Sequence, residues 1–302
     1  PFLKRGVPVK TMHLENVSYP ETWKDTKVLL MSYSNLKPLS KDSHSYIAKW
    51  VENGGVIVYS SRDTDPFQNV QEWWNQGENH FQRPSDHLFK LLNIGENPKE
   101  GEYSCGKGTV YIIRKNPKEF VLENDGDHEY VEIVKKMYEE KARAGELKFK
   151  NNFYLERGPF DLIAVLDESV NEEPFVVRGM FIDLFDPQLP VLTEKKVNPG
   201  EQSYLFDINR VEDKTKPQVL AAASRTYNEV RTKNSYSFIT KNPANTTDVM
   251  RVLLPSEPKL IITTDGTGKE RVVDMWKWDE KSKTLLLDFE NSPEGVKVLL
   301  KW

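Results

Sequence analysis

The first third of the chain alternates between two spacings of apolar residues, which predicts strands and helices in turn. Val28–Tyr33 and Val56–Tyr59 are short apolar runs, suited to strands that are buried on both faces. Between them Ser40 can cap a helix, and Gly54 and Gly55 can end it. The apolar residues of this helix recur at the spacing of one helical face: Tyr46, Ile47, Trp50 and Val51.

Further elements continue the same pattern up to residue 144. We expect a helix to start over Asn69–Trp74, another to be capped by Ser85, and a closing strand over Gly108–Arg114. Alternating strands and helices of this kind build a parallel sheet. The stretch Glu129–Ala144 is strongly helical, and we interpret it as a connector to the rest of the chain.

After residue 150 short apolar runs separated by turns replace the helical pattern, which predicts antiparallel strands. Those before the charged segment 211–217 are Phe153–Glu156, Phe160–Leu166, Phe175–Leu184 and Ser203–Ile208. Those after it are Val219–Ser224, Ser235–Thr240, Asp248–Leu254, Leu260–Thr264, Val272–Trp278, Thr284–Phe289 and Val296–Trp302. Seven strands in about 85 residues are typical of an immunoglobulin-like sandwich.

These patterns predict an α/β plus all-β protein. We place an α/β domain at residues 1–125, a connecting helix at 126–149, a β-rich domain at 150–212 and a C-terminal immunoglobulin-like β-sandwich at 213–302. One or two antiparallel sandwiches therefore follow the α/β domain. A chain of 302 residues is long enough for each domain to have its own core.

Charge and composition narrow the possible partners. The net charge is -4, with both signs interspersed, so we expect no nucleic-acid partner. No apolar run approaches the ~20 residues that a membrane-spanning helix needs, so we expect no spanning segment. The chain begins with Pro1 while an element is already under way, which we interpret as a piece of a longer protein.

The loop after the second predicted strand is the expected position of a functional site, because ligands of open α/β sheets collect at the carboxyl ends of strands. Arg62, Asp63 and Asp65 lie in this loop, and Trp73 and Trp74 follow it. Aromatic faces with carboxylate and guanidinium groups suit either a sugar or another protein surface. The loop has no cysteine, histidine or nucleophile elbow, so covalent catalysis is not expected there.

The acids that could form a glycosidase pair lie at strand ends in the β-rich part. Asp167 and Glu168 follow one apolar strand, and Asp183 and Asp186 flank the end of another. Neighbours on a strand point to opposite faces, so Asp167 and Glu168 cannot face each other. Catalysis would require one of them to meet Asp183 or Asp186 at a separation of about 5 Å or 6.5 to 9.5 Å.

Metal and cofactor chemistry have little support in the sequence. The five histidines show no metal-ligand spacing, and we expect neither a metal nor a cofactor. Cys105 is the only cysteine, with no histidine near it in sequence, and is interpreted as a small residue at a strand end.

Three segments of the predicted α/β domain are V-L-L-M-S-Y, K-P-L-S-K-D-S-H-S-Y-I-A-K-W-V-E-N-G-G-V-I-V-Y and G-K-G-T-V-Y. They resemble the glutamine-amidotransferase-like domain that follows the catalytic barrel in family 42 type β-galactosidases and related large bacterial glycosidase-like proteins. The segments R-G-P-F-D-L-I-A-V-L-D-E-S and R-G-M-F-I-D-L-F-D-P-Q-L-P-V-L are similar to the C-terminal sandwich regions of such proteins. The resemblance implies a flavodoxin-like domain that has lost amidotransferase catalysis and assembles into oligomers. It also implies an upstream catalytic domain in the same protein and a secreted, periplasmic or outer-surface location.

Three hypotheses follow from the sequence. The first is a non-catalytic C-terminal portion of a bacterial glycoside-hydrolase-like protein, which supports assembly and borders a sugar site. The second is a carbohydrate-binding module whose platform is Trp73 and Trp74 or the pair Trp276 and Trp278, which share one face of a strand. The third is a glycosidase with its acids inside this chain.

Overall fold

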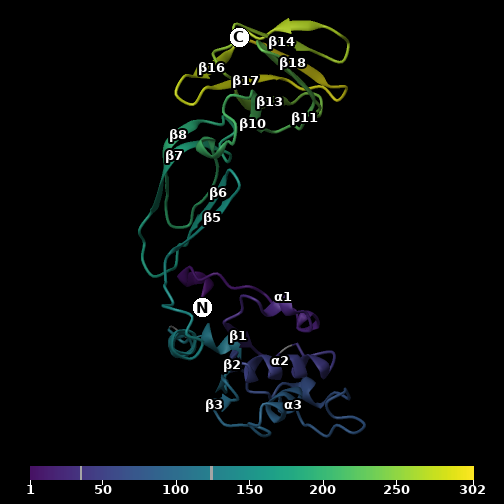
Figure 1. The fold of residues 1–302 in the computed structure, drawn as a ribbon, viewed down its shortest axis with the longest axis vertical. Helices are drawn as coiled ribbons and strands as arrows, with labels where there is room; N and C mark the ends of the chain where they lie inside the picture. The colour runs from purple at the N-terminus through teal and green to yellow at the C-terminus, as the bar shows by residue number, and fades with distance from the viewer. Residues whose placement is uncertain (35, 123–124) are drawn as a thin grey trace. The chain divides into compact units, whose positions relative to one another are not determined.

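The computed structural model describes residues 1–34, 36–122 and 125–302, which form two compact units, Pro1–Phe149 and Lys150–Trp302. The chain is mostly sheet with few helices, and the labelled helices of Figure 1 all belong to the first unit. Short helical elements of the first unit are η1 Leu3–Arg5, η2 Leu14–Asn16, α1 Pro20–Trp23, η3 Pro66–Asn69, η4 Pro117–Phe120 and η5 Met137–Lys141.

The first unit is built on a four-stranded sheet in the order β1-β2-β4-β3. β1 (Val28–Met31), β2 (Val56–Ser60) and β4 (Gly108–Ile113) are parallel, and β3 (Gly101–Cys105) pairs antiparallel with β4. The three predicted strands are confirmed, and β3 is an addition that the sequence pattern did not reveal. The flavodoxin-like arrangement of the resemblance stays a prediction.

Helices cover both faces of this sheet because its central strand is apolar on both sides. Ile57 and Tyr59 of β2 share a core cluster with α2 (Asp42–Glu52) and α3 (Pro84–Leu91). The alternate residues Val56 and Val58 share another cluster with α4 (His128–Lys136). All five residues of β2 are buried, so the strand forms the centre of three layers.

The helix expected over Asn69–Trp74 is wrong, because turns follow η3 in this segment. Side chains take the backbone carbonyls that a helix would use: the Trp74 indole donates to the Gln68 carbonyl, and the Asn75 amide donates to the Val70 carbonyl. Ser85 lies inside α3 rather than capping it, and its hydroxyl donates to Asp63 instead.

The helix predicted over Glu129–Ala144 ends as an α-helix at Lys136 and continues as a π-helical turn, η5. Its apolar stripe, with Tyr130, Val131, Val134 and Met137, is buried against the first sheet. The stripe that the sequence assigns to a connector therefore forms part of the core of the first unit.

The second unit begins with a five-stranded antiparallel sheet in the order β5-β6-β9-β7-β8, followed by the short helix η6 (Ile208–Arg210). Its strands are β5 Asn152–Arg157, β6 Phe160–Val165, β7 Phe175–Asp183, β8 Val191–Val197 and β9 Gln202–Asp207. The sequence pattern missed β8. This strand lies at the sheet edge, and its central residues are charged, so it lacks the apolar alternation of the inner strands.

Residues 213–302 form a sandwich of two antiparallel sheets, β10-β13-β17-β16 and β11-β12-β18-β14-β15. Its strands are β10 Gln218–Ala222, β11 Thr226–Arg231, β12 Ser235–Thr240, β13 Thr247–Leu253, β14 Leu260–Thr264, β15 Glu270–Val272, β16 Trp276–Asp279, β17 Thr284–Glu290 and β18 Val296–Lys301. The pattern missed the exposed edge strand β11 and merged β15 with β16. One apolar cluster fills the space between the two sheets.

A buried arginine joins the sandwich to the preceding sheet within the second unit. Arg251 on β13 donates from Nε and Nη2 to the carbonyl of Leu189, at 3.1 and 2.7 Å. Leu189 lies in the turn between β7 and β8 with a positive φ of 46°, and Arg251 is only 5% exposed. The arginine therefore satisfies a carbonyl at the meeting point of the two sheets.

We predict that Arg251→Ala lowers the free energy of unfolding of the second unit by roughly 3 kcal/mol, because it leaves a cavity and an unpaired carbonyl. Arg251→Met keeps most of the volume and removes a buried charge, so its cost should be about 1 kcal/mol. Urea unfolding of the full chain would measure both, with the exposed Arg225→Ala as control. An Arg251→Ala chain as stable as the wild type would contradict this assignment.

Candidate functional site

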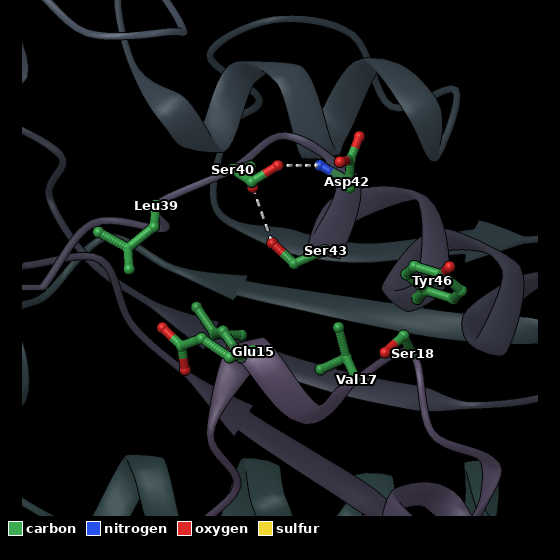
Figure 2. Close-up of a pocket in the computed structure, with 9 residues that line it drawn as sticks. Glu15, Val17, Ser18, Leu39, Ser40, Asp42, Ser43 and Tyr46 are labelled. Atoms are coloured by element: carbon green, nitrogen blue, oxygen red, sulfur yellow. Dashed lines mark hydrogen bonds between the residues drawn. The ribbon is translucent and has the colours of Figure 1, made fainter.

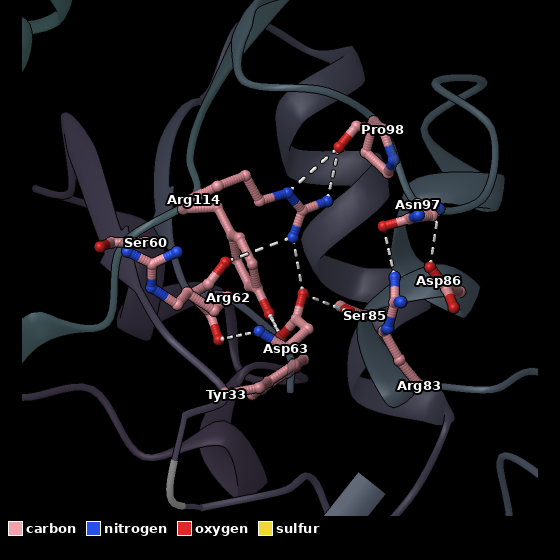
Figure 3. A network of polar contacts seen from close by, with 12 residues as sticks. Tyr33, Ser60, Arg62, Asp63, Arg83, Ser85, Asp86, Asn97, Pro98 and Arg114 are labelled. Carbon is pink, nitrogen blue, oxygen red and sulfur yellow. Dashed lines mark hydrogen bonds and ion pairs between the residues drawn. The ribbon is translucent and has the colours of Figure 1, made fainter. Parts of the chain in front are cut away.

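Asp63 is the centre of a hydrogen-bond network at the carboxyl edge of the parallel sheet (Figure 3). It follows β2 by three residues, has a positive φ of 53° and is 3% exposed. Its carboxylate accepts from the Tyr59 hydroxyl at 2.6 Å, the Ser85 hydroxyl at 2.9 Å and Arg114 Nη1 at 2.9 Å. Asp63 therefore connects β2, α3 and the end of β4.

Arg114 extends the network to the loop before β3. It follows β4 directly and donates from Nε and Nη2 to the carbonyl of Pro98, at 3.1 and 2.6 Å. Burial raises the pKa of Tyr59 well above its ordinary value, and the neighbouring Asp63 raises it further, so the phenol stays protonated and donates. Each of the three partners therefore donates a hydrogen bond to the Asp63 side chain.

Arg62 and Asp65 hold the loop on either side of Asp63. Arg62 is exposed and donates from Nε and Nη2 to the carboxylate of Glu119, with the closest pair 2.7 Å apart. The arginine and the backbone amide of Asn116 lower the pKa of Glu119 to about 2. Asp65 accepts from Lys37 at 2.8 Å and from Gln68 at 2.7 Å. Although burial raises the pKa of Asp65, these two bonds hold it below its ordinary value.

The two serines of the loop also form hydrogen bonds with backbone groups of the protein. The Ser60 hydroxyl donates to the carbonyl of Lys115 at 2.7 Å, and the Ser61 hydroxyl accepts from the Asp63 amide at 3.1 Å. Burial raises the pKa of the Cys105 thiol to about 11, with a further contribution from Glu52, so this thiol stays protonated. The two serine hydroxyls and the Cys105 thiol are therefore not arranged as nucleophiles.

Trp73 and Trp74 do not form an open aromatic platform. Trp74 is 2% exposed, and its indole donates to the Gln68 carbonyl at 3.1 Å. Trp73 is partly buried, and its indole donates to the Pro38 carbonyl at 2.8 Å. The two rings meet edge to face, with centroids 5.7 Å apart. Both side chains anchor the turn that follows η3 to the body of the first unit.

A row of three polar rings, two of them buried, lies beside Trp73 and was not predicted from the sequence. The Tyr33 hydroxyl lies 2.7 Å from His44 Nε2, and His44 Nδ1 lies 2.9 Å from His87 Nδ1. Trp73 meets both imidazoles edge to face, at 5.5 and 5.4 Å. His44 and His87 lie 43 residues apart in the chain, so their contact has no local signal in the sequence.

A shallow hollow of about 300 Å³ lies elsewhere on the first unit, between η2 and the start of α2 (Figure 2). Its polar side chains bond to nearby backbone: the Ser40 hydroxyl accepts from the Asp42 amide, and the Ser43 hydroxyl donates to the Ser40 carbonyl. Leu39 and Tyr46, on its rim, are exposed. The hollow is a surface feature with no buried charged group to orient a ligand.

The register of the second unit keeps the predicted acids apart. Asp183 lies opposite Leu205 of β9, whereas Asp167 lies beside Gly200 at the other end of that strand. Five residues of strand separate these levels by about 16 Å, far beyond the roughly 5 to 9.5 Å of a catalytic pair. Asp183 pairs with Lys195 at 2.6 Å. Asp186 accepts from the Gln188 amide and Asp167 from the Glu168 amide, as turn residues do.

A different set of acids does come together, around Arg210. This arginine contacts Asp161 at 2.8 Å, Glu156 at 3.0 Å and Asp207 at 3.2 Å. The Tyr154 hydroxyl donates to Glu156 at 2.8 Å and to Asp161 at 3.2 Å. Arg210 pairs with all three carboxylates, so the cluster ties the strands β5 and β6 to η6. Sequence reasoning missed it because the partners lie on separate elements.

The remaining aromatic pair, Trp276 and Trp278, packs against the core of the sandwich from β16. The Trp278 indole donates to the Glu280 carboxylate at 2.7 Å. Both rings are therefore only partly exposed.

In residues 1–34, 36–122 and 125–302, no three histidine, cysteine, aspartate or glutamate side chains gather closely enough to hold a metal ion. In the same part of the chain, no helix has the length and apolar character to span a membrane.

No protein-family model and no curated protein sequence matches this chain. Among solved structures, it is similar to the exo-carrageenase GH42 of Bacteroides ovatus, with 9% identity and a TM-score of 0.22 over 98% of this chain and 24% of the enzyme. It is also similar to the GH31 dextranase of Flavobacterium johnsoniae, with 9% identity and a TM-score of 0.22 over 87% of this chain and 38% of the enzyme. These neighbours are glycoside hydrolases, and the chain spans less than two fifths of either of them.

Proposed function

We propose that this chain is a non-catalytic scaffold region of a bacterial glycoside-hydrolase-like protein, in which another domain of the same protein carries the reaction. The single observation that supports the scaffold role is the Asp63 network. At the sheet edge where an α/β domain usually places its chemistry, the carboxylate, both serines and the arginines all bond to the protein itself. The class of the parent protein comes from the resemblance of the sequence.

This proposal changes the roles first expected for the loop. Asp63 and Trp74 are buried and serve the scaffold, while Arg62 remains exposed and Trp73 partly so. Of the five residues expected to form a site, Arg62 is therefore the one most accessible to a sugar bound beside the loop. Assembly into a homo-oligomer and a location outside the cytoplasm belong to the same proposal.

We predict that the isolated chain releases no nitrophenol from a panel of aryl glycosides above the rate of the buffer alone. Asp161→Asn and Asp183→Asn should give the same result, because these carboxylates bond to Arg210 and Lys195 rather than face each other across a cleft. A hydrolysis rate in the wild type that either variant abolishes would overturn the scaffold proposal.

The carbohydrate-binding alternative is tested by affinity electrophoresis in gels that contain polysaccharides. A scaffold should migrate as in a plain gel, and Trp73→Ala should behave alike. Retardation that Trp73→Ala removes would identify the loop as a glycan site and replace the scaffold role.

A further inference from the structure

The row Tyr33, His44 and His87 has the geometry of a proton chain with a fixed direction. His44 is fully buried and His87 partly so, and their rings stack with centroids 5.2 Å apart. Burial raises the pKa of Tyr33 well above its ordinary value, with a smaller contribution from Asp63, so its phenol keeps its proton. Because a buried hydroxyl needs an acceptor and His44 Nε2 lies 2.7 Å away, Tyr33 donates to His44 Nε2.

That direction assigns the other two protons. With Nε2 as acceptor, neutral His44 carries its proton on Nδ1 and donates it to His87 Nδ1. His87 then carries its own proton on Nε2, away from His44. The Tyr33–His44 and His44–His87 contacts therefore contain one hydrogen-bonding proton each. Both hydrogen bonds can form in this direction only while both imidazoles are neutral.

We propose that His44 and His87 form an acid-sensitive latch: while both rings are neutral they hold Trp73 against the sheet edge, and protonation of His87 releases Trp73. The Trp73 ring packs edge to face on each imidazole and on Trp74, and its indole donates to the Pro38 carbonyl. Two of these four contacts involve the imidazoles of the row.

Protonation of His87 breaks the chain for a geometric reason. A second proton on His87 must occupy Nδ1, which would place two N–H groups against each other across 2.9 Å. Either one ring turns, or His44 carries its proton on Nε2 and the buried Tyr33 hydroxyl loses its acceptor. Both outcomes weaken the row on which Trp73 packs. The attraction of a cation to an indole ring, worth about 0.5 to 2 kcal/mol, is smaller than the combined cost of a lost bond and a partly buried charge.

Charged groups of both signs lie on the elements around the pair. Lys41 directly precedes α2, Lys90 and the buried Asp86 lie on α3, and Asp63 faces Tyr33 from the loop. Burial lowers the pKa of His87, and Lys41 and Lys90 lower it further. Burial, followed by His87, lowers the pKa of His44 to about 3.

The sign of the pH effect follows from these directions. Released rings regain their ordinary pKa of about 6.5, so the released state binds more protons than the latched state in acid. The latch is therefore at full strength above pH 6.5 and weakens as the pH falls below it, with His87 the first to take a proton.

The test labels the full chain with 5-fluorotryptophan and follows the fluorine resonances between about pH 7.5 and 5.0. Of the seven tryptophans, the Trp73 signal is assigned by Trp73→Phe. We expect the Trp73 signal to move toward its position in the unfolded chain as the pH falls below 6.5, while the signals of Trp23 and Trp50, which stack on each other, keep their positions. A static Trp73 signal, or joint movement of all three signals as in unfolding, would overturn the latch.

Substitution of the titrating ring completes the test. His87→Gln cannot take a proton, and we expect it to reduce the movement of the Trp73 signal to less than a fifth of that in the wild type. His87→Phe retains an aromatic ring beside His44 and serves if the glutamine variant does not fold. His80 is exposed in the segment before α3 and outside the row of rings, so His80→Gln should keep the wild-type response. The same acid response in both His87 variants would refute the assignment.

Discussion

Replacement of Asp63 by alanine is expected to lower the free energy of unfolding of the first unit by roughly 3 to 4 kcal/mol. The substitution removes the acceptor of Tyr59, Ser85 and Arg114 together, and leaves buried donors without partners. Alanine also has no side chain to stabilise the positive φ of 53°, which adds about 1 kcal/mol. Urea unfolding of the full chain, followed by a probe in the first unit, measures the loss.

Asp63→Asn is the matched variant for this prediction. Asparagine tolerates a positive φ and keeps one oxygen acceptor, but it loses the ion pair with Arg114. We expect it to cost about half as much as alanine, on the order of 2 kcal/mol. If the alanine variant were as stable as the wild type, or the asparagine variant less stable than the alanine one, the network would not be what holds the sheet edge.

The second large effect is expected from Gly108→Ala, at the start of β4. A methyl group at this position would fall well inside contact distance of the carbonyl oxygens of Val51 and Gly55. Both are backbone atoms at the end of α2, and the neighbouring amides of Lys107 and Thr109 bond to Glu52 and Gly55 there. Because backbone cannot move aside as a flexible side chain does, the variant should lose roughly 3 kcal/mol or more.

Gly77→Ala separates this clash from a general cost of replacing glycine. Gly77 has a positive φ of 64°, and no atom lies within 4 Å of an added methyl group. Its cost should be the backbone strain alone, about 1 kcal/mol. Thermal unfolding of the two variants beside the wild type gives the order, and equal midpoints for Gly108→Ala and Gly77→Ala would contradict the close approach of β4 to α2.

Part of the candidate site could be located from local patterns. The apolar run of β2 and the polar loop after it are visible in the sequence, and the carboxyl edge of a parallel sheet follows from the strand–helix order. The partners of Asp63 could not be found in this way. Ser85 and Arg114 lie 22 and 51 residues further along the chain, and only the packing of α3 and β4 on β2 brings them together.

The sequence also could not show whether the candidate acids of the second unit lie close together. Asp167, Glu168, Asp183 and Asp186 look alike in sequence, because each lies near the end of an apolar run. Their separation depends on which strands pair and in what register, and β9 lies between β6 and β7. Register is a property of paired strands, so no single run of residues contains it.

The sequence by itself determined the order and the kind of the main elements, because apolar spacing reports locally which face of a strand or helix is buried. It also determined that the loop after β2 lacks a nucleophile elbow. Only the tertiary structure decided that Asp63 and Trp74 are buried, that the helix at 128–136 covers the first sheet, and that His44 meets His87. Contacts between residues far apart in the chain depend on strand pairing and helix packing, and neither leaves a local signature.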